Sequence, residues 1–356
     1  MSKLHHITLL ILLLALGCGA VHAQKKPATP ESDVEVLRIN TNLVTVPVSV
    51  ADRQGRFIAG LRQSQFHLYE NGVEQKIAFF DNAESPFTVA LLLDTSDSTR
   101  GRLGEIQQAA LAFLDQLREH DRVLVACFDR QIRVASEITS DRQKLRATIL
   151  QARTGGGTGL YDTFDAIVNQ RLKKISGRKA IVLFTDGVDV SSTSATYEST
   201  LYTAQEIDAL VFPIQYNTYA DLTRNASAQN GMQILTAKGE RMDVAYERAN
   251  RYLRSLSDKT GGRLYNTESM NRLTEAFASI AQELRQQYSI GYYPADGGKT
   301  ERTIKVKVDA PDVSVRARKA FRYRSANDRI AKRYSSVSGL ANRNHLRNQG
   351  QLLTAL

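Results

Sequence analysis

The sequence predicts an α/β fold, with a doubly wound and mainly parallel sheet flanked by helices, and a small all-β module beside it. Short runs such as residues 87–93 are apolar on both faces, as expected for the buried strands of a parallel sheet. Between residues 86 and 287 these runs alternate with segments of helical periodicity. The flanking segments, 34–84 and 288–324, show the strict alternation of half-buried strands instead.

The first 23 residues are expected to be a signal peptide. Lys3 precedes an apolar run at 9–16, and Ala23 ends a small-residue cleavage site. Cys18 gives an alternative, because residues 14–18 resemble a bacterial lipobox in which two residues are exchanged. The protein is therefore expected to be exported. It would be periplasmic or secreted after cleavage at Ala23, or a lipoprotein anchored through Cys18.

The segment 34–84 is predicted to be all β. Apolar and polar residues alternate along 43–50 and along 66–70. An Asn-Gly pair at 71–72 separates the second run from a third at 75–80, and this pair is a strong signal for a two-residue hairpin. So few strands bury a face poorly, and the segment therefore needs a partner.

Residues 86–287 are predicted to form the α/β domain. Apolar residues recur at helical spacing along 103–117, directly after the first buried strand. Further strands are expected at 122–128, 132–138, 179–185, 210–215 and 263–266, and further helices at 142–151, 160–175, 195–208, 244–260 and 273–287. The polar stretch at 217–241 is expected to be a long surface loop.

The chain returns to β character at 288–324. Strands are expected at 288–293, 303–308 and 313–318. Because the ends of a domain often lie close together, we predict that these strands and those of 34–84 form one sandwich-like module, with the α/β domain inserted between them. Its core candidates, some of which strand alternation turns outward, are Val46, Val48, Phe66, Leu68, Ile290, Ile304, Val306 and Val308. The polar, basic tail at 325–356 is predicted to be disordered.

Oxygen-bearing side chains collect where predicted strands end. The first strand of the α/β domain ends in Asp94, and Ser96 and Ser98 follow at spacings of two and four. Thr158 lies in a glycine-rich loop, and Asp186 ends a second buried strand. Ligands of α/β folds bind at the carboxyl ends of strands. Carboxylate and hydroxyl oxygens suit Mg²⁺, Mn²⁺ or Ca²⁺ better than softer metals.

These five residues resemble the metal-ion-dependent adhesion site of the von Willebrand factor A domain, whose pattern is Asp-x-Ser-x-Ser, then Thr, then Asp. The resemblance implies that Ser96 and Ser98 coordinate the metal through their hydroxyls. It implies that Thr158 coordinates directly or through water, and that Asp94 and Asp186 lie close by, often through water. It also implies an open metal position that a carboxylate of a protein partner fills.

Flanking motifs extend the resemblance to an acidobacterial type of exported proteins related to von Willebrand factor A, over roughly residues 36–324. They are residues 48–55, residues 66–72, a Tyr-x-x-Gly-Tyr-Tyr-Pro run at 288–294 and an Arg-Ala-Arg run at 316–318. The resemblance therefore implies a fold and a metal site, but it does not imply a particular biological role.

The metal motif departs from the family at Asp97, where Gly is frequent. We expect this side chain to point to solvent. Arg100 is available to hold an acidic ligand, or it simply begins a solvated helix. In a purely structural alternative, Ser96 or Ser98 caps the helix that begins near Gly101.

The function we expect is adhesion or protein–protein binding through the metal. The alternatives are an envelope scaffold with a vestigial metal site and a metal-dependent hydrolase. The hydrolase is disfavoured because the chain after Ala23 holds only His67, His120 and His345, which lie in unrelated predicted elements. The glycine-rich loop also lacks the Gly-Lys-Ser/Thr ending of a phosphate loop. An enzyme is therefore not expected.

Cysteine usage narrows the chemistry further. After cleavage at Ala23 only Cys127 remains, within a strand-like apolar run. It is expected to be a buried small hydrophobic residue, and neither a disulfide framework nor a thiolate zinc site is possible.

The formal net charge of +10 is concentrated toward the C-terminus. From Arg302 to the end, 13 Lys and Arg residues stand against 3 Asp and Glu residues. One interpretation is a solvated tail, and another is binding to acidic envelope polymers or a membrane surface. Nucleic acid is not an expected partner, because no nucleic-acid motif is present.

Overall fold

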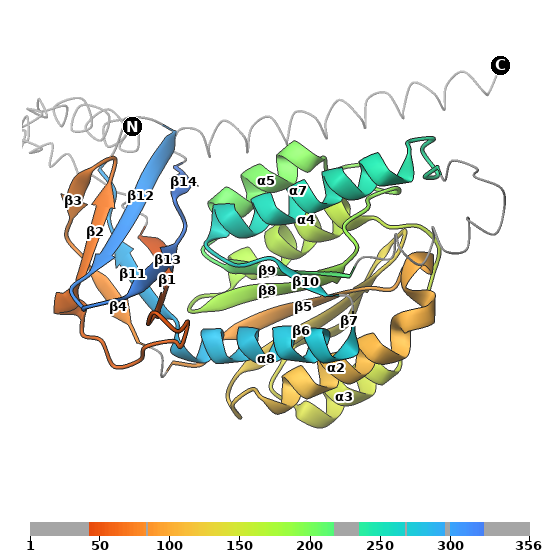
Figure 1. The fold of residues 1–356 in the computed structure, drawn as a ribbon, viewed down its shortest axis with the longest axis horizontal. Coiled ribbons are helices and arrows are strands. Elements are labelled where there is room, and N and C mark those ends of the chain that lie inside the picture. Colours follow the sequence, from red (N-terminus) through yellow and green to blue (C-terminus); the bar gives the residue numbers. More distant parts are fainter. Residues whose placement is uncertain (1–42, 83–84, 217–234, 268, 296–299, 324–356) are drawn as a thin grey trace, which may run out of the picture. The chain divides into compact units, whose positions relative to one another are not determined.

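The computed structural model describes residues 43–82, 85–216, 235–267, 269–295 and 300–323. The predicted signal peptide at 1–23 and tail at 325–356 lie outside these residues, as does most of the polar stretch at 217–241. The described strands form one six-stranded sheet and two four-stranded sheets (Figure 1). No helix within the described ranges is long and apolar enough to cross a membrane.

The six-stranded sheet has the order β10-β9-β8-β5-β6-β7. Its strands are β5 (Thr88–Asp94), β6 (Arg122–Phe128), β7 (Ile132–Thr139), β8 (Lys179–Thr185), β9 (Leu210–Tyr216) and β10 (Tyr265–Thr267). Every pairing is parallel except that of β7, which runs antiparallel to β6 at one edge. All residues of β5, β8 and β9 are buried, as strands covered on both faces require. The predicted mainly parallel sheet is confirmed.

Helices cover both faces of this sheet (Figure 1). One face carries α2 (Leu103–Asp115), α3 (Arg142–Leu150) and α8 (Met270–Gln286), and the other carries α4 (Leu160–Gln170), α5 (Tyr197–Glu206) and α7 (Met242–Thr260). Alternate residues of β5 feed the two resulting cores, since Leu91 packs in the first and Leu92 in the second. Cys127 is buried in the first core, where it acts as a small apolar residue.

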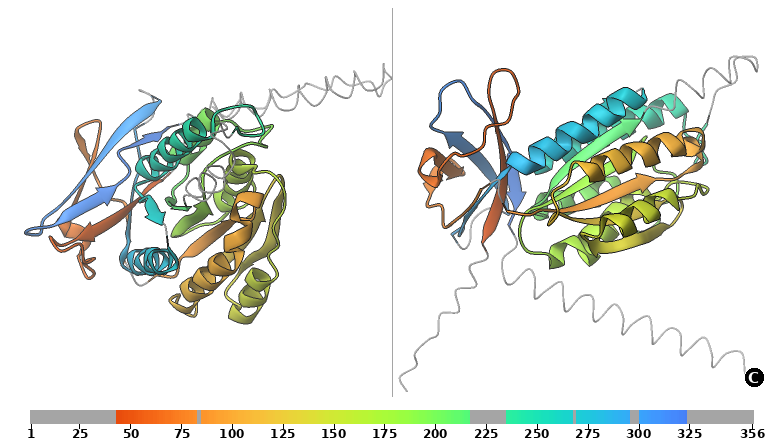
Figure 2. Two further views of the ribbon diagram at one scale, coloured as in Figure 1. Left: turned by 45° about the vertical axis from the view of Figure 1, so that its right-hand side comes forward. Right: turned by 90° about the horizontal axis from the view of Figure 1, so that it is seen from below.

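The two four-stranded sheets have the orders β13-β1-β11-β4 and β14-β12-β2-β3. Their strands are β1 (Val44–Ala51), β2 (Phe66–Glu70), β3 (Val73–Gln75), β4 (Phe79–Asp81), β11 (Tyr288–Tyr292), β12 (Glu301–Val308), β13 (Ser314–Ala317) and β14 (Ala320–Arg322). Each sheet mixes early and late strands, because β1 lies between β11 and β13 and β2 pairs with β12. The predicted β module built from both flanks is therefore present (Figure 2).

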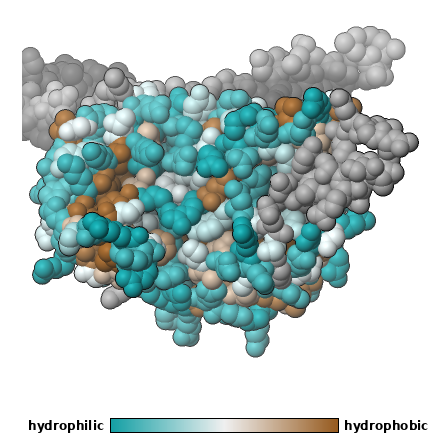
Figure 3. Space-filling model, in the orientation of Figure 1, coloured by the Kyte–Doolittle hydropathy of each residue, from teal (hydrophilic) through white to brown (hydrophobic). Residues whose placement is uncertain are grey.

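The two small sheets share one core. Six of the eight predicted core residues are buried, and Val306 and Val308 are half-buried at its edge. Tyr288, Tyr292 and Phe321 join that core. On the face drawn in Figure 3, hydrophobic residues gather over these sandwich strands, while much of the remaining surface is hydrophilic.

The prediction of one continuous strand at 75–80 is wrong, because this segment is divided between two strands. β3 ends at Gln75, and the chain then crosses to the other sheet, where β4 pairs with β11. The reason is the hairpin, in which Glu70 pairs with Val73 around Asn71 (φ 49°) and Gly72 (φ 85°). Such a tight turn starts β3 two residues earlier than the hydrophobic pattern alone predicts.

Helices α4 and α5 are shorter than predicted, and one strand was missed. α4 ends at Gln170 and is followed by the short 3₁₀ helix η3 (Leu172–Lys174). α5 begins only at Tyr197, because Thr196 caps it through its side chain and accepts from the Ser199 amide. β14 is a three-residue edge strand, too short to leave an alternation pattern.

The sandwich contacts the α/β domain through side chains of β1, β13 and the residues after β13. Ser49 donates to Glu283 of α8 at 2.7 Å, and Arg316 pairs with the same carboxylate. Arg318 donates to the carbonyls of Ala204 and Ile207 at the end of α5. These contacts lie near the amino ends of the parallel strands, so the carboxyl edge of the sheet is left to the candidate site.

Candidate metal centre

The site begins where two neighbouring strands end. β5 and β8 pair in parallel, with Leu93 opposite Phe184, so the loops after both strands leave the same edge of the sheet. Asp94 is the last residue of β5, and Asp186 follows β8 directly. Both carboxylates are buried, at 0% and 2% exposure.

Both carboxylate oxygens of Asp94 accept hydrogen bonds. Its Oδ1 accepts from the Ser96 amide at 2.9 Å, and its Oδ2 accepts from Thr185 Oγ1 at 2.6 Å. Burial, followed by the nearby charge of Asp186, raises the pKa of Asp94 from 3.8 to about 7. A buried carboxylate whose ionisation is disfavoured by a second one fits a site that binds positive charge.

The two serine hydroxyls lie together beside Asp94. Ser96 Oγ and Ser98 Oγ are 3.0 Å apart. Ser96 precedes the short 3₁₀ helix η2 (Asp97–Arg102) but makes no capping hydrogen bond through its side chain. The structure thus does not support the alternative in which Ser96 serves as a helix cap. Thr99 binds the backbone here instead, donating to the Ser96 carbonyl at 2.8 Å.

The glycine-rich loop links both strand ends. The Gly155 amide donates to the Thr95 carbonyl at 2.8 Å, which ties the loop to the segment after β5. The Thr158 carbonyl accepts from the amides of Val190 and Ser191, at 3.0 and 2.9 Å, in the segment after β8. Thr158 itself is 5% exposed. The loop therefore lies between the two carboxylate-bearing segments, with the predicted threonine buried within it.

Asp129 is a residue of this edge that sequence reasoning missed. It follows β6, and a Cβ atom on Gly155 would lie 2.0 Å from its Oδ2, so only glycine fits against it. Its carbonyl accepts from the Gly159 amide at 2.6 Å, and its side chain pairs with Arg133 at 2.6 Å. Asp129 therefore shapes the loop that carries Thr158. The available signal was its position after a predicted strand of the same sheet.

Asp186 is positioned by residues from distant parts of the chain. Its Oδ2 accepts from the Tyr246 hydroxyl of α7 at 3.2 Å, and its Oδ1 accepts from the Val188 amide at 2.9 Å. The Gln215 side chain donates to its carbonyl at 3.0 Å. No motif spacing could have identified Tyr246, because only the packing of α7 brings it to the site.

The departure from the family pattern at Asp97 leaves the buried centre unchanged. Its side chain is 57% exposed and pairs with Arg100, which is 69% exposed. As expected, this carboxylate points to solvent and does not add a third buried charge. Arg100 remains accessible to a ligand at the rim.

The donor set fits a hard divalent cation. Asp94 and Asp186 supply carboxylates, and Ser96, Ser98 and Thr158 supply hydroxyls. Within the described ranges, no group of three or more His, Cys, Asp or Glu side chains could hold a metal ion. A cation at this edge would therefore depend on the hydroxyls, and the ligand roles of the five residues stay a prediction.

Comparison with known proteins identifies the domain. Residues 89–188, from β5 to the segment after β8, match the family model of the von Willebrand factor type A domain. The chain therefore carries a von Willebrand factor type A domain, and the matched range includes all five predicted ligands. The acidobacterial type of the flanks stays a prediction. A comparison with curated proteins finds no match.

Solved structures show only weak likeness. BatB from Bacteroides thetaiotaomicron, a conserved hypothetical protein, is 16% identical with a TM-score of 0.40, covering 56% of this chain and 97% of that chain. A von Willebrand factor type A structure from Catenulispora acidiphila is 12% identical with a TM-score of 0.43, covering 82% and 76%. Proximal thread matrix protein 1 from the mussel byssus, with a zinc-occupied MIDAS motif, is 11% identical with a TM-score of 0.44, covering 62% and 50%.

Proposed function

We propose that this protein is a metal-dependent binding module that captures an acidic group of a protein partner. Asp94, Ser96, Ser98, Thr158 and Asp186 would hold a divalent cation. The proposal rests mainly on one observation. The buried carboxylate of Asp94 lies beside Asp186, the adjacent hydroxyls of Ser96 and Ser98 are 3.0 Å apart, and the Ser96 side chain caps no helix.

The charge balance of the site supports an acidic ligand. Two carboxylates offset a charge of +2, and the three remaining donors are neutral. A bound cation would supply an electrophilic position for a carboxylate from the partner, in a setting with little water. Asp97 and Arg100 pair at the rim, so neither adds a repulsive charge inside.

The cation is proposed to be Mg²⁺, with Mn²⁺ or Ca²⁺ as alternatives. Carboxylate and hydroxyl oxygens are hard ligands that these ions prefer. Calorimetric titration of the full chain with each ion tests this choice, and Zn²⁺ is titrated alongside as the cation recorded for the mussel protein.

The protein is also proposed to be exported, as a periplasmic or secreted protein or as a lipoprotein anchored through Cys18. The basic region from Arg302 onward would add contacts to an acidic envelope polymer or a membrane surface. A scaffold with a vestigial metal site is the competing function, and an enzymatic role is not proposed.

Binding to immobilised envelope proteins, with Mg²⁺ or with a chelator, separates adhesion from scaffold. Asp94→Ala removes a proposed ligand, and Asp97→Ala removes an exposed carboxylate from the same loop as a matched control. Adhesion predicts binding that is lost with the chelator and with Asp94→Ala but kept with Asp97→Ala. Binding that ignores both chelator and Asp94→Ala would favour the scaffold.

A further inference from the structure

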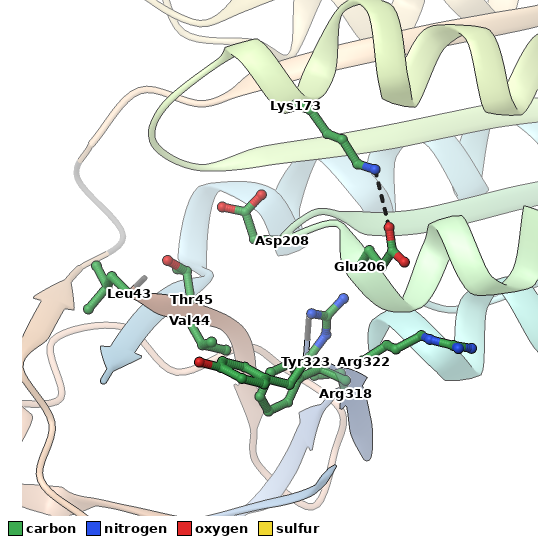
Figure 4. A pocket seen from close by; sticks show the side chains of 10 residues that line it. Leu43, Val44, Thr45, Lys173, Glu206, Asp208, Arg318, Arg322 and Tyr323 are labelled. Atoms are coloured by element: carbon green, nitrogen blue, oxygen red, sulfur yellow. Dashed lines mark hydrogen bonds and ion pairs between the residues drawn. The ribbon is translucent and has the colours of Figure 1, made fainter. Parts of the chain in front are cut away.

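A cavity lies between the sandwich and the α/β domain (Figure 4). Its volume is about 360 Å³, which lies within the common range for small-molecule sites of roughly 300–1,000 Å³. One side is formed by β1 and β14, and the other by η3 and the end of α5. Asp208, which precedes β9, lines it, so the cavity lies toward the amino ends of the parallel strands and is separate from the candidate metal centre.

A buried guanidinium lines this cavity. Arg318 is only 3% exposed, and its Nη2 donates to the carbonyls of Ala204, at 3.3 Å, and Ile207. Its Nε has no hydrogen-bond partner among the described residues, and none of their carboxylates forms an ion pair with it. Burial lowers the pKa of Arg318 to about 10, so the group still carries its charge at neutral pH.

The cavity also contains carboxylates, but these have cationic partners. Glu206 pairs with Lys173 at 3.3 Å, the contact drawn as a dashed line in Figure 4. Asp208 pairs with Lys179 at 2.8 Å. The charge of Asp208 still acts on Arg318, but no described carboxylate forms a close ion pair with it, although a buried charge normally has such a partner.

The rest of the lining includes an apolar part. Val44, Phe321 and Tyr323 line it, and Leu43, which is 38% exposed, lies at its mouth. The second arginine of the lining, Arg322, stacks over the Tyr202 ring at 4.7 Å and is therefore already engaged. An apolar wall with one buried cation favours a ligand that has an apolar body and one negative charge.

We propose that this cavity binds an organic carboxylate, whose acid group pairs with Arg318 and whose apolar body packs against Val44 and Tyr323. In a purely structural role, Arg318 would cap the last carbonyls of α5. That role occupies Nη2 alone and provides no counter-charge for the guanidinium. A free organic acid and the C-terminal residue of a peptide offer the same chemistry.

The test is calorimetric titration of the full chain with three probes. 4-Phenylbutyrate represents a free acid, acetyl-Ala-Phe a peptide C-terminus, and 4-phenylbutyramide the uncharged form of the first. At least one acid should bind, and the amide should bind at least tenfold more weakly than 4-phenylbutyrate if that acid binds, because a charge-assisted hydrogen bond is lost. The acid that binds more tightly shows whether the natural ligand is a free organic acid or a peptide C-terminus. Absence of binding by both acids, or equal binding of acid and amide, would overturn the proposal.

Two variants locate the binding. Thr45→Phe should fill the cavity without removing Arg318, and Ala135→Phe adds the same ring at an exposed position of β7 as its control. We expect at least a tenfold loss of acid binding with Thr45→Phe and no change with Ala135→Phe. Unchanged binding in a folded Thr45→Phe protein would contradict the assignment.

Arg318 is then tested directly. Arg318→Gln should abolish acid binding, whereas Arg322→Gln should change it less than threefold. If Arg318→Gln does not fold, Thr45→Phe still decides the question. A chelator should leave the binding unchanged, so the result is independent of the proposed metal-dependent function.

Discussion

Ser49 of β1 donates a 2.7 Å hydrogen bond to the fully buried Glu283 of α8, which joins the first described strand of the sandwich to the last helix of the α/β domain. Arg316 of β13 pairs with the same carboxylate and donates to the Gly261 carbonyl at 3.0 Å. One acidic side chain thus connects both flanks of the chain to the inserted domain.

The first prediction concerns this junction. Glu283→Gln removes the charge that pairs with Arg316, so the free energy of unfolding should fall by about 1–3 kcal/mol. Urea denaturation measures the change. Arg53→Gln is the matched control, because its ion pair with Asp312 is exposed on both sides and should contribute little. An equal effect of both substitutions would show that the buried ion pair at the junction stabilises the protein no more than the exposed one.

The second prediction concerns metal binding. Asp94→Asn should abolish the binding of Mg²⁺ or Mn²⁺, measured by calorimetry, while the fold is kept. In the presence of a chelator the same variant should melt at a higher temperature than the wild type, because it removes the repulsion between two buried carboxylates. Asp97→Asn, at an exposed position of the same loop, should change neither quantity. Wild-type metal affinity in Asp94→Asn would exclude the proposed site.

The third prediction concerns pH. Because burial and Asp186 raise the pKa of Asp94 to about 7, the metal-free folded state binds a proton that the unfolded chain, with a pKa near 3.8, has already released. The contribution of Asp94 to stability is therefore complete below about pH 4 and declines as pH rises to about 7. Denaturation between pH 4 and 8 with chelator should show this decline in the wild type and a weaker one in Asp94→Asn. Identical pH profiles would contradict it.

The fourth prediction concerns a histidine between two carboxylates. His67 of β2 contacts Glu74 at 2.7 Å and Asp309 at 2.9 Å, and these hydrogen bonds, with Glu74 the larger cause, raise its pKa above 6.5. Its stabilising effect is complete below pH 6.5 and is lost as pH rises through the raised pKa. NMR titration of the imidazole should show the raised value, and Glu74→Gln should lower it. A pKa at or below 6.5 in the wild type would oppose the assigned contacts.

The fifth prediction concerns the sandwich. Removing residues 288–356 takes away β11 and β13, the two strands that flank β1, and also β12, the partner of β2. The segment 34–84 should then become sensitive to proteases at sites that the full chain protects. Limited proteolysis followed by mass spectrometry measures this. Equal protection in both proteins would mean that the early strands hold together without the late ones.

The sequence predicted best those elements for which two independent signals agree. The bounds of β2, β6 and β8 match residue for residue, because apolar runs and flanking turn or charged residues mark the same limits. β14 has three residues, and its place is decided by pairing with β12 rather than by its own pattern. The division of 75–80 between two sheets likewise depends on contacts that are remote in sequence.

The same distinction holds at the site. Asp94, Ser96 and Ser98 come together because a short loop after one strand confines them, which spacing alone reveals. Asp129 and Tyr246 act on the site from β6 and α7, so their contribution depends on how those elements pack. Candidate ligands that lie close together in the chain can be predicted from the sequence, whereas the residues that position them from other elements cannot.

The central position of β1 has a consequence for how the chain acquires its structure. Its neighbours on both sides come from the late part of the sequence, and Ser49 contacts Glu283 at a sequence separation of 234. During synthesis, β1 therefore lacks both of its partner strands until almost the whole described chain has emerged. The von Willebrand factor A domain can meanwhile form from nearer contacts. Formation of the sandwich is therefore a late folding step that depends on contacts remote in sequence. Until it is complete, the unpaired early strands are the part of the molecule most prone to aggregation.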